Sequence, residues 1–180
     1  YGYKNKTEKD ADGYDLYQPI WKVDCNEPSY RKDKEGKKIP YATPPGPSEL
    51  IGTPVLYKGK AYCAIGQDPE HGDGVGRLSC IDASTGEVIW KYLDVGRTIS
   101  TVSIADDLVY LAEYAGIIHC IDANTGKVYW THDSFSRIWG STLVVDGKLV
   151  LGNEDGDLLI MDHGKTKPEV QTINMGAPVY

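Results

Sequence analysis

The fold is decided by a stretch that occurs twice in this chain. It reads Leu78-Ser79-Cys80-Ile81-Asp82-Ala83-Ser84-Thr85-Gly86-Glu87-Val88-Ile89-Trp90, and it returns 40 residues later as Ile118-His119-Cys120-Ile121-Asp122-Ala123-Asn124-Thr125-Gly126-Lys127-Val128-Tyr129-Trp130. A third, degraded copy follows at the same offset, from Leu158 to Lys165. A period of about 40 to 45 residues made only of strands is typical of propeller blades. The sequence therefore predicts an all-β protein, a β-propeller of four-stranded antiparallel blades.

The residues that recur in each copy are interpreted as structural. A short carboxylate before a turn accepts backbone N–H bonds, and glycine adopts the positive φ that tight hairpins need. A tryptophan once per blade suits packing between neighbouring sheets, with its N–H bonded to adjacent backbone. The repeat residues given these roles are Asp82, Gly86, Trp90, Asp122, Gly126, Trp130 and Asp162.

Apolar alternation and turn residues divide each unit into four short strands. In the first unit we expect strands at 53–57, 60–65, 77–82 and 88–92. Short turns for the first hairpin of each unit are expected at Lys58-Gly59, Asp106-Asp107 and Asp146-Gly147.

The repeat also predicts how the chain is organised. We expect the end of a preceding blade at 1–25, a polar Pro-rich insertion at 26–48, blades at 49–93, 94–134 and 135–174, and the start of a further blade at 175–180. Three full blades with two partial ones leave a ring open, and we expect a complete ring of seven or eight blades. The missing blades would come from a longer natural protein, from copies of this chain or from another chain.

Composition excludes several classes of protein. The 180 residues are 41% hydrophobic and 25% charged, which is typical of a globular domain. A net charge of −7 argues against a nucleic-acid partner, and no apolar run is long enough to span a membrane. Motifs for nucleophilic hydrolases, phosphate loops and zinc proteases are absent from the sequence.

The string Ile-Asp-Ala-x-Thr-Gly-x-Val-x-Trp, at 81–90 and 121–130, resembles the tryptophan-docking motif of the PQQ-type (pyrroloquinoline-quinone-type) β-propeller repeats. Residues 49–180 fit this pattern. The family includes quinoprotein alcohol dehydrogenases and non-enzymatic propellers such as the outer-membrane assembly lipoprotein, so the resemblance implies a fold and leaves the function open. The stretches 66–76 and 137–142 also resemble PQQ-binding-like propeller proteins of planctomycete-type bacteria.

Candidate binding residues gather on one predicted face. In this topology, the loops between second and third strands and the connections between blades surround one end of the central channel. Arg97 and Arg137 hold equivalent repeat positions with Glu49, while Trp139 replaces the aliphatic residues of neighbouring units. Trp139, Arg97 and Arg137 are therefore the candidates for contacting a planar cofactor.

Potential metal ligands are densest at 68–73. The candidates are Asp68, Glu70 and Asp73, beside His71, and an oxygen-rich cluster of this kind suits calcium. The stretch lacks the spacing of an EF-hand loop and has only one histidine, so a simple polar loop is the favoured interpretation and calcium binding is the alternative.

Two functions are compared. The first is a non-catalytic scaffold that binds protein partners, without a cofactor, in the periplasm or outside the cell, a location implied by the family resemblance. The alternative is part of a quinoprotein dehydrogenase that uses PQQ and calcium. The family's enzymes usually show an adjacent Cys-Cys pair and a catalytic Asp near calcium ligands. The sequence has no Cys-Cys pair, so the scaffold is favoured and any catalytic residues would lie in missing blades.

The four cysteines are expected to be free thiols. A hairpin centred on Tyr114-Ala115 would set Cys120 opposite Val109, and the same offset would set Cys80 opposite Ala61. Cys63 and Cys80 would then be diagonal neighbours on one face, a geometry that reaches disulfide range only with distortion.

Overall fold

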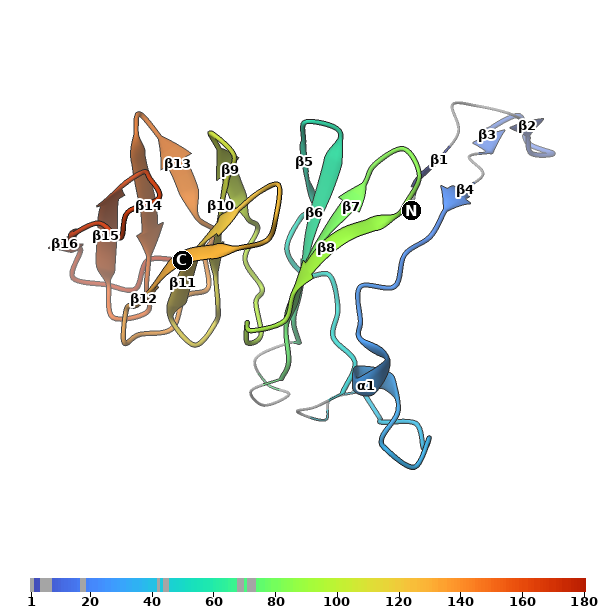
Figure 1. Cartoon of the computed structure of the whole chain (residues 1–180), viewed down its shortest axis with the longest axis horizontal. Helices are drawn as coiled ribbons and strands as arrows, with labels where there is room; N and C mark the ends of the chain where they lie inside the picture. The colour runs from blue at the N-terminus through green and yellow to red at the C-terminus, as the bar shows by residue number, and fades with distance from the viewer. Residues whose placement is uncertain are drawn as a thin grey trace.

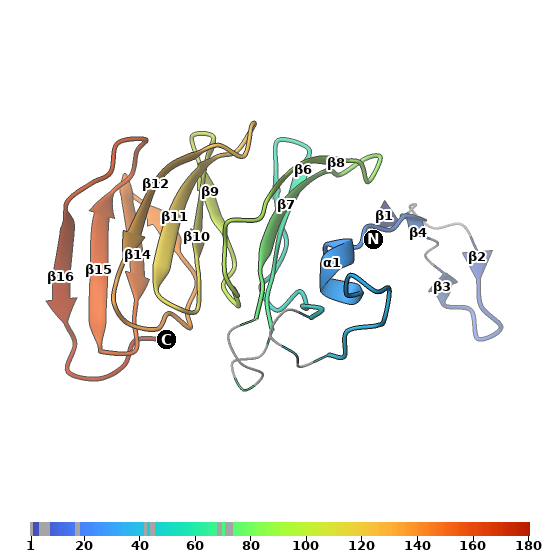
Figure 2. The same cartoon turned by 60° about the horizontal axis from the view of Figure 1, so that its bottom comes forward.

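The computed structural model describes residues 2–3, 8–16, 19–41, 43, 46–67, 70 and 74–180. Within these residues, three four-stranded antiparallel sheets lie side by side (Figures 1 and 2). The first sheet has β5 (Val55–Tyr57), β6 (Lys60–Ile65), β7 (Arg77–Asp82) and β8 (Val88–Tyr92). The second has β9 (Ser103–Ala105), β10 (Leu108–Ala112), β11 (Ile117–Asp122) and β12 (Val128–Asp133). The third has β13 (Leu143–Val145), β14 (Lys148–Gly152), β15 (Asp157–Asp162) and β16 (Val170–Asn174). The predicted all-β class and four-stranded sheets are confirmed.

The residues before the first sheet form smaller elements. The strands are β1 (Gly2–Tyr3), β2 (Glu8–Lys9), β3 (Asp15–Leu16) and β4 (Pro19–Trp21), and the one-turn helix α1 spans Pro28–Arg31. β1 pairs with β4, and β2 pairs with β3. The β2–β3 hairpin lies at the far end of the molecule from the third sheet (Figures 1 and 2).

The first hairpin of each sheet closes through a two-residue turn, as predicted. Both residues of each turn have positive φ, which is the backbone of a type I′ turn and matches the twist of the flanking strands. The φ values are 47° and 75° at Lys58-Gly59, 48° and 60° at Asp106-Asp107, and 49° and 70° at Asp146-Gly147.

The second hairpin differs from the prediction by one residue. Cys120 pairs with Tyr110 rather than Val109, and Cys80 pairs with Tyr62 rather than Ala61. In the second sheet the turn has three residues, 114–116, because the N–H of Glu113 bonds Ile117 O and Gly116 takes a φ of 106°. A shift of one residue exchanges the faces of a strand, so the predicted Cys63–Cys80 contact is wrong.

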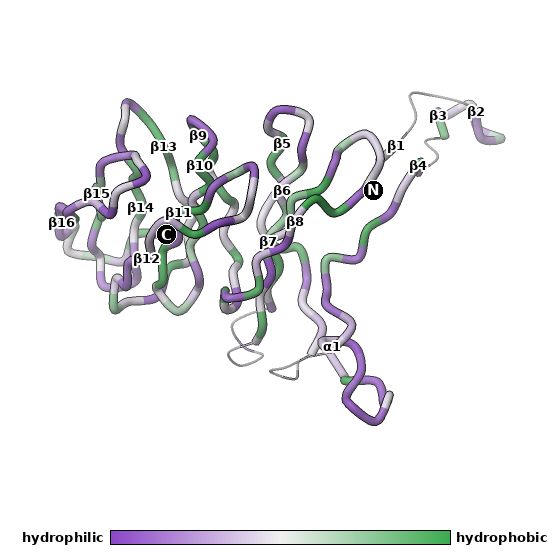
Figure 3. The backbone as a smooth tube through the Cα atoms, viewed as in Figure 1, coloured by the Kyte–Doolittle hydropathy of each residue, from purple (hydrophilic) through white to green (hydrophobic). Residues whose placement is uncertain are grey.

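Apolar side chains fill the spaces between the sheets. One buried cluster lies between the first and second sheets and another between the second and third, each built from alternate residues of the facing strands. A third cluster joins the first sheet to Trp21, Val23, Cys25 and Tyr30. Figure 3 shows the hydrophobic strands of the sheets and the hydrophilic segment around α1.

Tryptophans connect each layer to the next. The indole N–H donates to a carbonyl in a turn of the following sheet: Trp21 to Ala83 O (3.2 Å), Trp90 to Ala123 O (3.1 Å) and Trp130 to Gly164 O (3.0 Å). The rings also lie against glycine. A Cβ at Gly86 or Gly126 would come within 2.6 Å or 2.8 Å of the ring of Trp21 or Trp90, so a larger residue would displace the indole.

The repeated aspartates fix two of these turns. The carboxylate of Asp82 accepts the backbone N–H groups of Ser84 (2.8 Å) and Thr85 (2.9 Å), and Asp122 does the same in the second sheet. Asp162 instead forms an ion pair with Lys148. The degraded third copy therefore keeps the carboxylate in a different role.

Candidate functional site

One side of the three sheets collects the turns and connections that the sequence singled out. We call it the loop face, and it lies along the lower side in Figure 2. Its described residues are 93–102, 113–116, 134–142, 153–156 and 175–180.

Backbone hydrogen bonds tie the loop face together. Each connection between sheets receives a bond from a turn 17 residues further along the chain. The bonds run from Gly66 N to Glu49 O (2.9 Å), from Tyr114 N to Arg97 O (2.9 Å) and from Glu154 N to Arg137 O (2.8 Å). Glu49, Arg97 and Arg137 therefore occupy equivalent places, as the repeat alignment predicts.

The three predicted cofactor-contacting residues meet around a tyrosine that was not among them. The guanidinium carbon of Arg97 lies 4.5 Å from the ring centroid of Tyr114, and that of Arg137 lies 5.5 Å from it. Trp139 packs edge to face with Tyr114, with 5.0 Å between ring centroids. We call these four residues the Tyr114 cluster. These contacts are cation–π and aromatic, and they bring planar groups together.

The members of the cluster differ in exposure. Arg97 is 5% and Tyr114 8% exposed, so both belong to the floor of the loop face. Trp139 is 37% exposed, and the Arg137 side chain is 60% exposed with Glu154 as its ion-pair partner at 3.8 Å. The surface of the cluster is therefore one aromatic ring beside one guanidinium group.

Two further aromatic side chains are exposed along the loop face. Phe135, the only phenylalanine of the chain, is 88% exposed and has a φ of 57°. Tyr180 is 73% exposed, and its ring lies 6.2 Å from that of Trp139. Such large exposed rings on one side mark a surface suited to contact with another molecule.

The predicted calcium ligands fall mostly where nothing is described. Asp68 and Asp73 lie outside the described residues, and Glu70 is exposed. Among the described residues, no group of three or more histidine, cysteine, aspartate or glutamate side chains is placed to hold a metal.

Next to the Tyr114 cluster in the sequence, Glu113 belongs to a series of hydrogen-bonded polar side chains. The Nε2 atom of His119 is 2.7 Å from Glu113 Oε1, and its Nδ1 atom is 3.2 Å from the hydroxyl of Tyr92 on the neighbouring sheet. Burial, with the charges of Asp94 and Glu113, raises the pKa of Tyr92 to about 12. The only signal in the sequence is that His119 occupies the place of Ser79 in the first copy.

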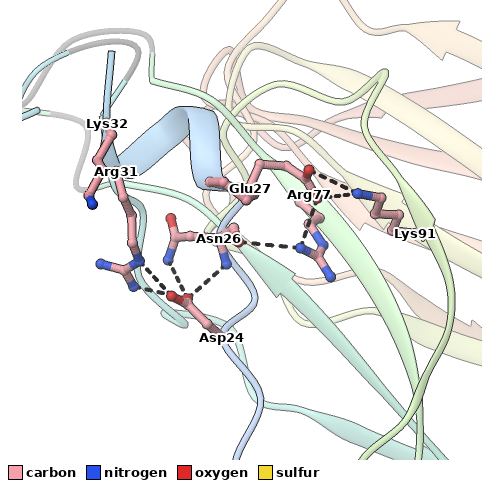
Figure 4. Close-up of a pocket in the computed structure, with 8 residues that line it drawn as sticks. Asp24, Asn26, Glu27, Arg31, Lys32, Arg77 and Lys91 are labelled. Atoms are coloured by element: carbon pink, nitrogen blue, oxygen red, sulfur yellow. Dashed lines mark hydrogen bonds and ion pairs between the residues drawn. The ribbon is translucent and has the colours of Figure 1, made fainter. Parts of the chain in front are cut away.

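A second polar site, the Glu27 pocket, lies where the α1 segment meets the first sheet (Figure 4). Its volume is about 560 Å³. The Glu27 carboxylate accepts hydrogen bonds from Arg77 (2.9 Å) and Lys91 (2.7 and 2.8 Å). Arg31 donates to Asp24 through two N–H groups, at 2.5 and 2.9 Å.

These ion pairs fasten the α1 segment to the sheet. The Arg77 side chain is 6% exposed and that of Glu27 13%, so the pair that joins them is buried. Hydrogen bonds from Arg31 lower the pKa of Asp24 to about 2 and keep it ionised. Arg77 is not a residue that recurs in the repeat, so the sequence does not reveal its pairing with Glu27. The charged residues at 31–38 likewise do not reveal that Arg31 pairs with Asp24.

Solved structures with similar folds include BamB and quinohemoprotein alcohol dehydrogenases. BamB from Moraxella catarrhalis matches with a TM-score of 0.57 and 22% identity, over 69% of this chain and 36% of that chain. Quinohemoprotein alcohol dehydrogenase ADHIIG from Pseudomonas putida HK5 matches with a TM-score of 0.53 and 23% identity, over 68% of this chain and 20% of that chain. The quinohemoprotein alcohol dehydrogenase from Comamonas testosteroni matches with a TM-score of 0.54 and 23% identity, over 69% of this chain and 21% of that chain. At these identities the likeness shows the fold alone.

The fold is thus that of a β-propeller, and the chain spans about a third of the BamB structure and a fifth of the two dehydrogenases. A search of the curated proteins returned no match. None of the helices in the described part of the chain is long and apolar enough to cross a membrane. The sequence model of one family matches residues 74–172, which is more than half of the chain. The chain therefore belongs to the PQQ-repeat family described as outer membrane protein assembly factor BamB.

Proposed function

We propose that this chain is a non-catalytic PQQ-like propeller that binds another protein through its loop face. The observation that carries the proposal is the arrangement of Trp139, Arg137 and Phe135 as exposed side chains above the buried Arg97 and Tyr114. Tryptophan, tyrosine and arginine are the residues that most often dominate the binding energy of protein interfaces.

The backbone at Phe135 strengthens this argument. A bulky residue at a φ of 57° costs conformational energy, and a ring that is 88% exposed returns no packing energy to the folded chain. A role in contact with a partner accounts for both features.

The described residues of the loop face do not fit a bound quinone. Arg97 is buried under Tyr114, so it offers little surface to a cofactor. The Arg137 guanidinium lies over the same ring and pairs with Glu154, so both arginines are already engaged within the face. We therefore propose that the loop face works without PQQ. That it needs no calcium stays a prediction, since Asp68 and Asp73 lie outside the described residues.

The family points to a location and to a class of partner. The family description names the outer membrane protein assembly factor BamB, and the Moraxella catarrhalis structure is also of BamB. We propose a periplasmic or secreted location, with the partner either a separate protein or further blades that complete the ring. The closer resemblance to planctomycete-type proteins stays a prediction.

Site-directed photo-crosslinking in the native source tests the proposal. A photoreactive residue at Phe135 should trap a defined partner, whereas one at Lys127, exposed in a turn at the opposite side of the sheets, should not. Arg137→Glu should abolish co-purification of that partner, and Lys127→Glu should leave it unchanged. Equal trapping at both sites would refute the assignment of the face. A quinone absorbance with stoichiometric calcium in the purified protein would refute the non-catalytic assignment.

A further inference from the structure

Two cysteines from distant parts of the chain meet in the third apolar cluster. Cys25 follows β4 and is 6% exposed, and Cys63 lies in β6 and is 7% exposed. Both belong to the same apolar cluster and line the same cavity, and their side chains interact closely enough to shift the two thiol pKa values in opposite directions. The sequence repeat gives no sign of this contact, because neither position recurs as cysteine in the other units.

Alternation along both segments brings the thiols together. Trp21, Val23 and Cys25 face the first sheet, while the residues between them are exposed. Cys63 lies on the facing side of β6, two residues from Ala61, which belongs to the same cluster. The bond from Trp21 Nε1 to Ala83 O sets the position of the segment along the sheet.

Contacts on the far side of Cys25 hold it in place. Asn26 donates to Ser48 O (3.0 Å) and accepts from Ser48 N (2.7 Å), and Glu27 pairs with the buried Arg77. The cysteine is thus fixed between a docked tryptophan and a buried ion pair. A preorganised pair of thiols loses little further freedom when it is joined.

The surroundings favour attack by Cys25. The side-chain interaction with Cys63 and the positive charge of Arg77 lower the pKa of the Cys25 thiol, and the same interaction raises the pKa of Cys63. The thiolate is the reactive form of cysteine. Both residues line a cavity of about 380 Å³, which gives a small reagent a route to them.

We propose that Cys25 and Cys63 are a redox pair that closes to a disulfide by exchange with a small-molecule disulfide such as oxidised glutathione. The Cys25 thiolate attacks one sulfur of the oxidant and releases one glutathione thiol. Cys63 gives up its proton and attacks the Cys25 sulfur of the mixed disulfide, which releases the second glutathione. The protein loses two electrons and two protons, and the oxidant gains both. All four cysteines are free in the present structure, which is the reduced form of the pair.

The other two cysteines are not part of this pair. Cys80 lies on the opposite face of the first sheet, and Cys120 lies in the second sheet beside Gly164 O. Both are fully buried. The new bond would close the segment from 25 to 63, and with it the α1 segment, onto the first sheet.

Thiol counting on the full chain tests the proposal. After equilibration with oxidised glutathione, alkylation under denaturing conditions should find two thiols of the original four, and peptide mapping should find a Cys25–Cys63 crosslink. The melting temperature should rise by about 10 °C, since a loop of nearly forty residues is closed. Four remaining thiols, or a crosslink that includes Cys80 or Cys120, would overturn the proposal.

Variants separate the two steps. Cys63→Ser should stop the reaction at a single glutathione adduct on Cys25, because the resolving thiol is gone. Cys80→Ala is the matched control and should oxidise as the wild type does. If the glutathione adduct of Cys63→Ser is found on a cysteine other than Cys25, the assignment of Cys25 as the attacking thiol is wrong. The wild-type thiol count needs no variant, so poor folding of either one leaves the test intact.

Discussion

Replacing Trp130 with alanine should destabilise the protein more than any change at the loop face. The ring is 5% exposed and belongs to the cluster that joins the second and third sheets. It lies 5.9 Å from the ring of Tyr110, and its N–H donates to Gly164 O at 3.0 Å. The substitution therefore removes packing and a hydrogen bond at the same interface.

The magnitude follows from the buried area. A tryptophan that buries about 200 Å² contributes roughly 5 kcal/mol at about 25 cal/mol per Å². Denatured chains already bury part of that area, so the expected loss in the free energy of unfolding for Trp130→Ala is about 3 to 5 kcal/mol. Trp130→Phe keeps most of the packing and loses the donor, so it should cost about 1 to 2 kcal/mol.

Urea denaturation followed by circular dichroism measures these losses without relying on tryptophan fluorescence. Trp139→Ala is the matched control, since that ring is 37% exposed, and it should cost less than about 2 kcal/mol. A loss below about 1 kcal/mol for Trp130→Ala, or equal losses for the alanine and phenylalanine variants, would refute this account of the interface.

Three further changes test other parts of the structure. Gly126→Ala should cost about 2 kcal/mol more than Gly147→Ala in chemical denaturation, because both have positive φ but only Gly126 lies against an indole ring. Hydrogen bonds from the hydroxyl and N–H groups of the following turn lower the pKa of Asp82 from 3.8 to about 2. This stabilisation is complete only above about pH 5 and is lost as the pH falls towards 2, so Asp82→Asn should flatten the dependence of the urea midpoint on pH over that range. Arg77→Met leaves Glu27 without its buried partner, so it should cost about 3 kcal/mol and speed amide exchange in α1.

The strands and the first hairpins could be predicted because the signals are local. Two-residue turns such as Asp146-Gly147 need positive φ, and the sequence supplies glycine or aspartate at these positions. The apolar alternation then fixes which strands face a neighbouring sheet. The register of the second hairpin could not be predicted as well, because the sequence around Gly116 is compatible with a turn of either two or three residues. The φ of 106° at Gly116 belongs to the three-residue turn that the structure has.

The contacts between distant segments could be predicted only in part. The equivalence of Arg97 and Arg137 followed from the repeat, but their common partner Tyr114 did not, because its position in the turn depends on the register. The pairing of Arg77 with Glu27 joins a repeat to a segment without one, so no periodicity could reveal it. The contact between Cys25 and Cys63 could not be predicted either, because neither position recurs as cysteine in the other units.

The backbone bonds of the loop face have a consequence for how such proteins diversify. They join main-chain atoms only, and the three equivalent pairs carry different combinations of side chains: Glu49 with Gly66, Arg97 with Tyr114, and Arg137 with Glu154. The frame that holds the surface therefore constrains the displayed side chains little, except at Gly66, where a Cβ would come within 2.2 Å of Thr98 O. New recognition specificities can evolve there, or be grafted by design, while the architecture beneath stays the same.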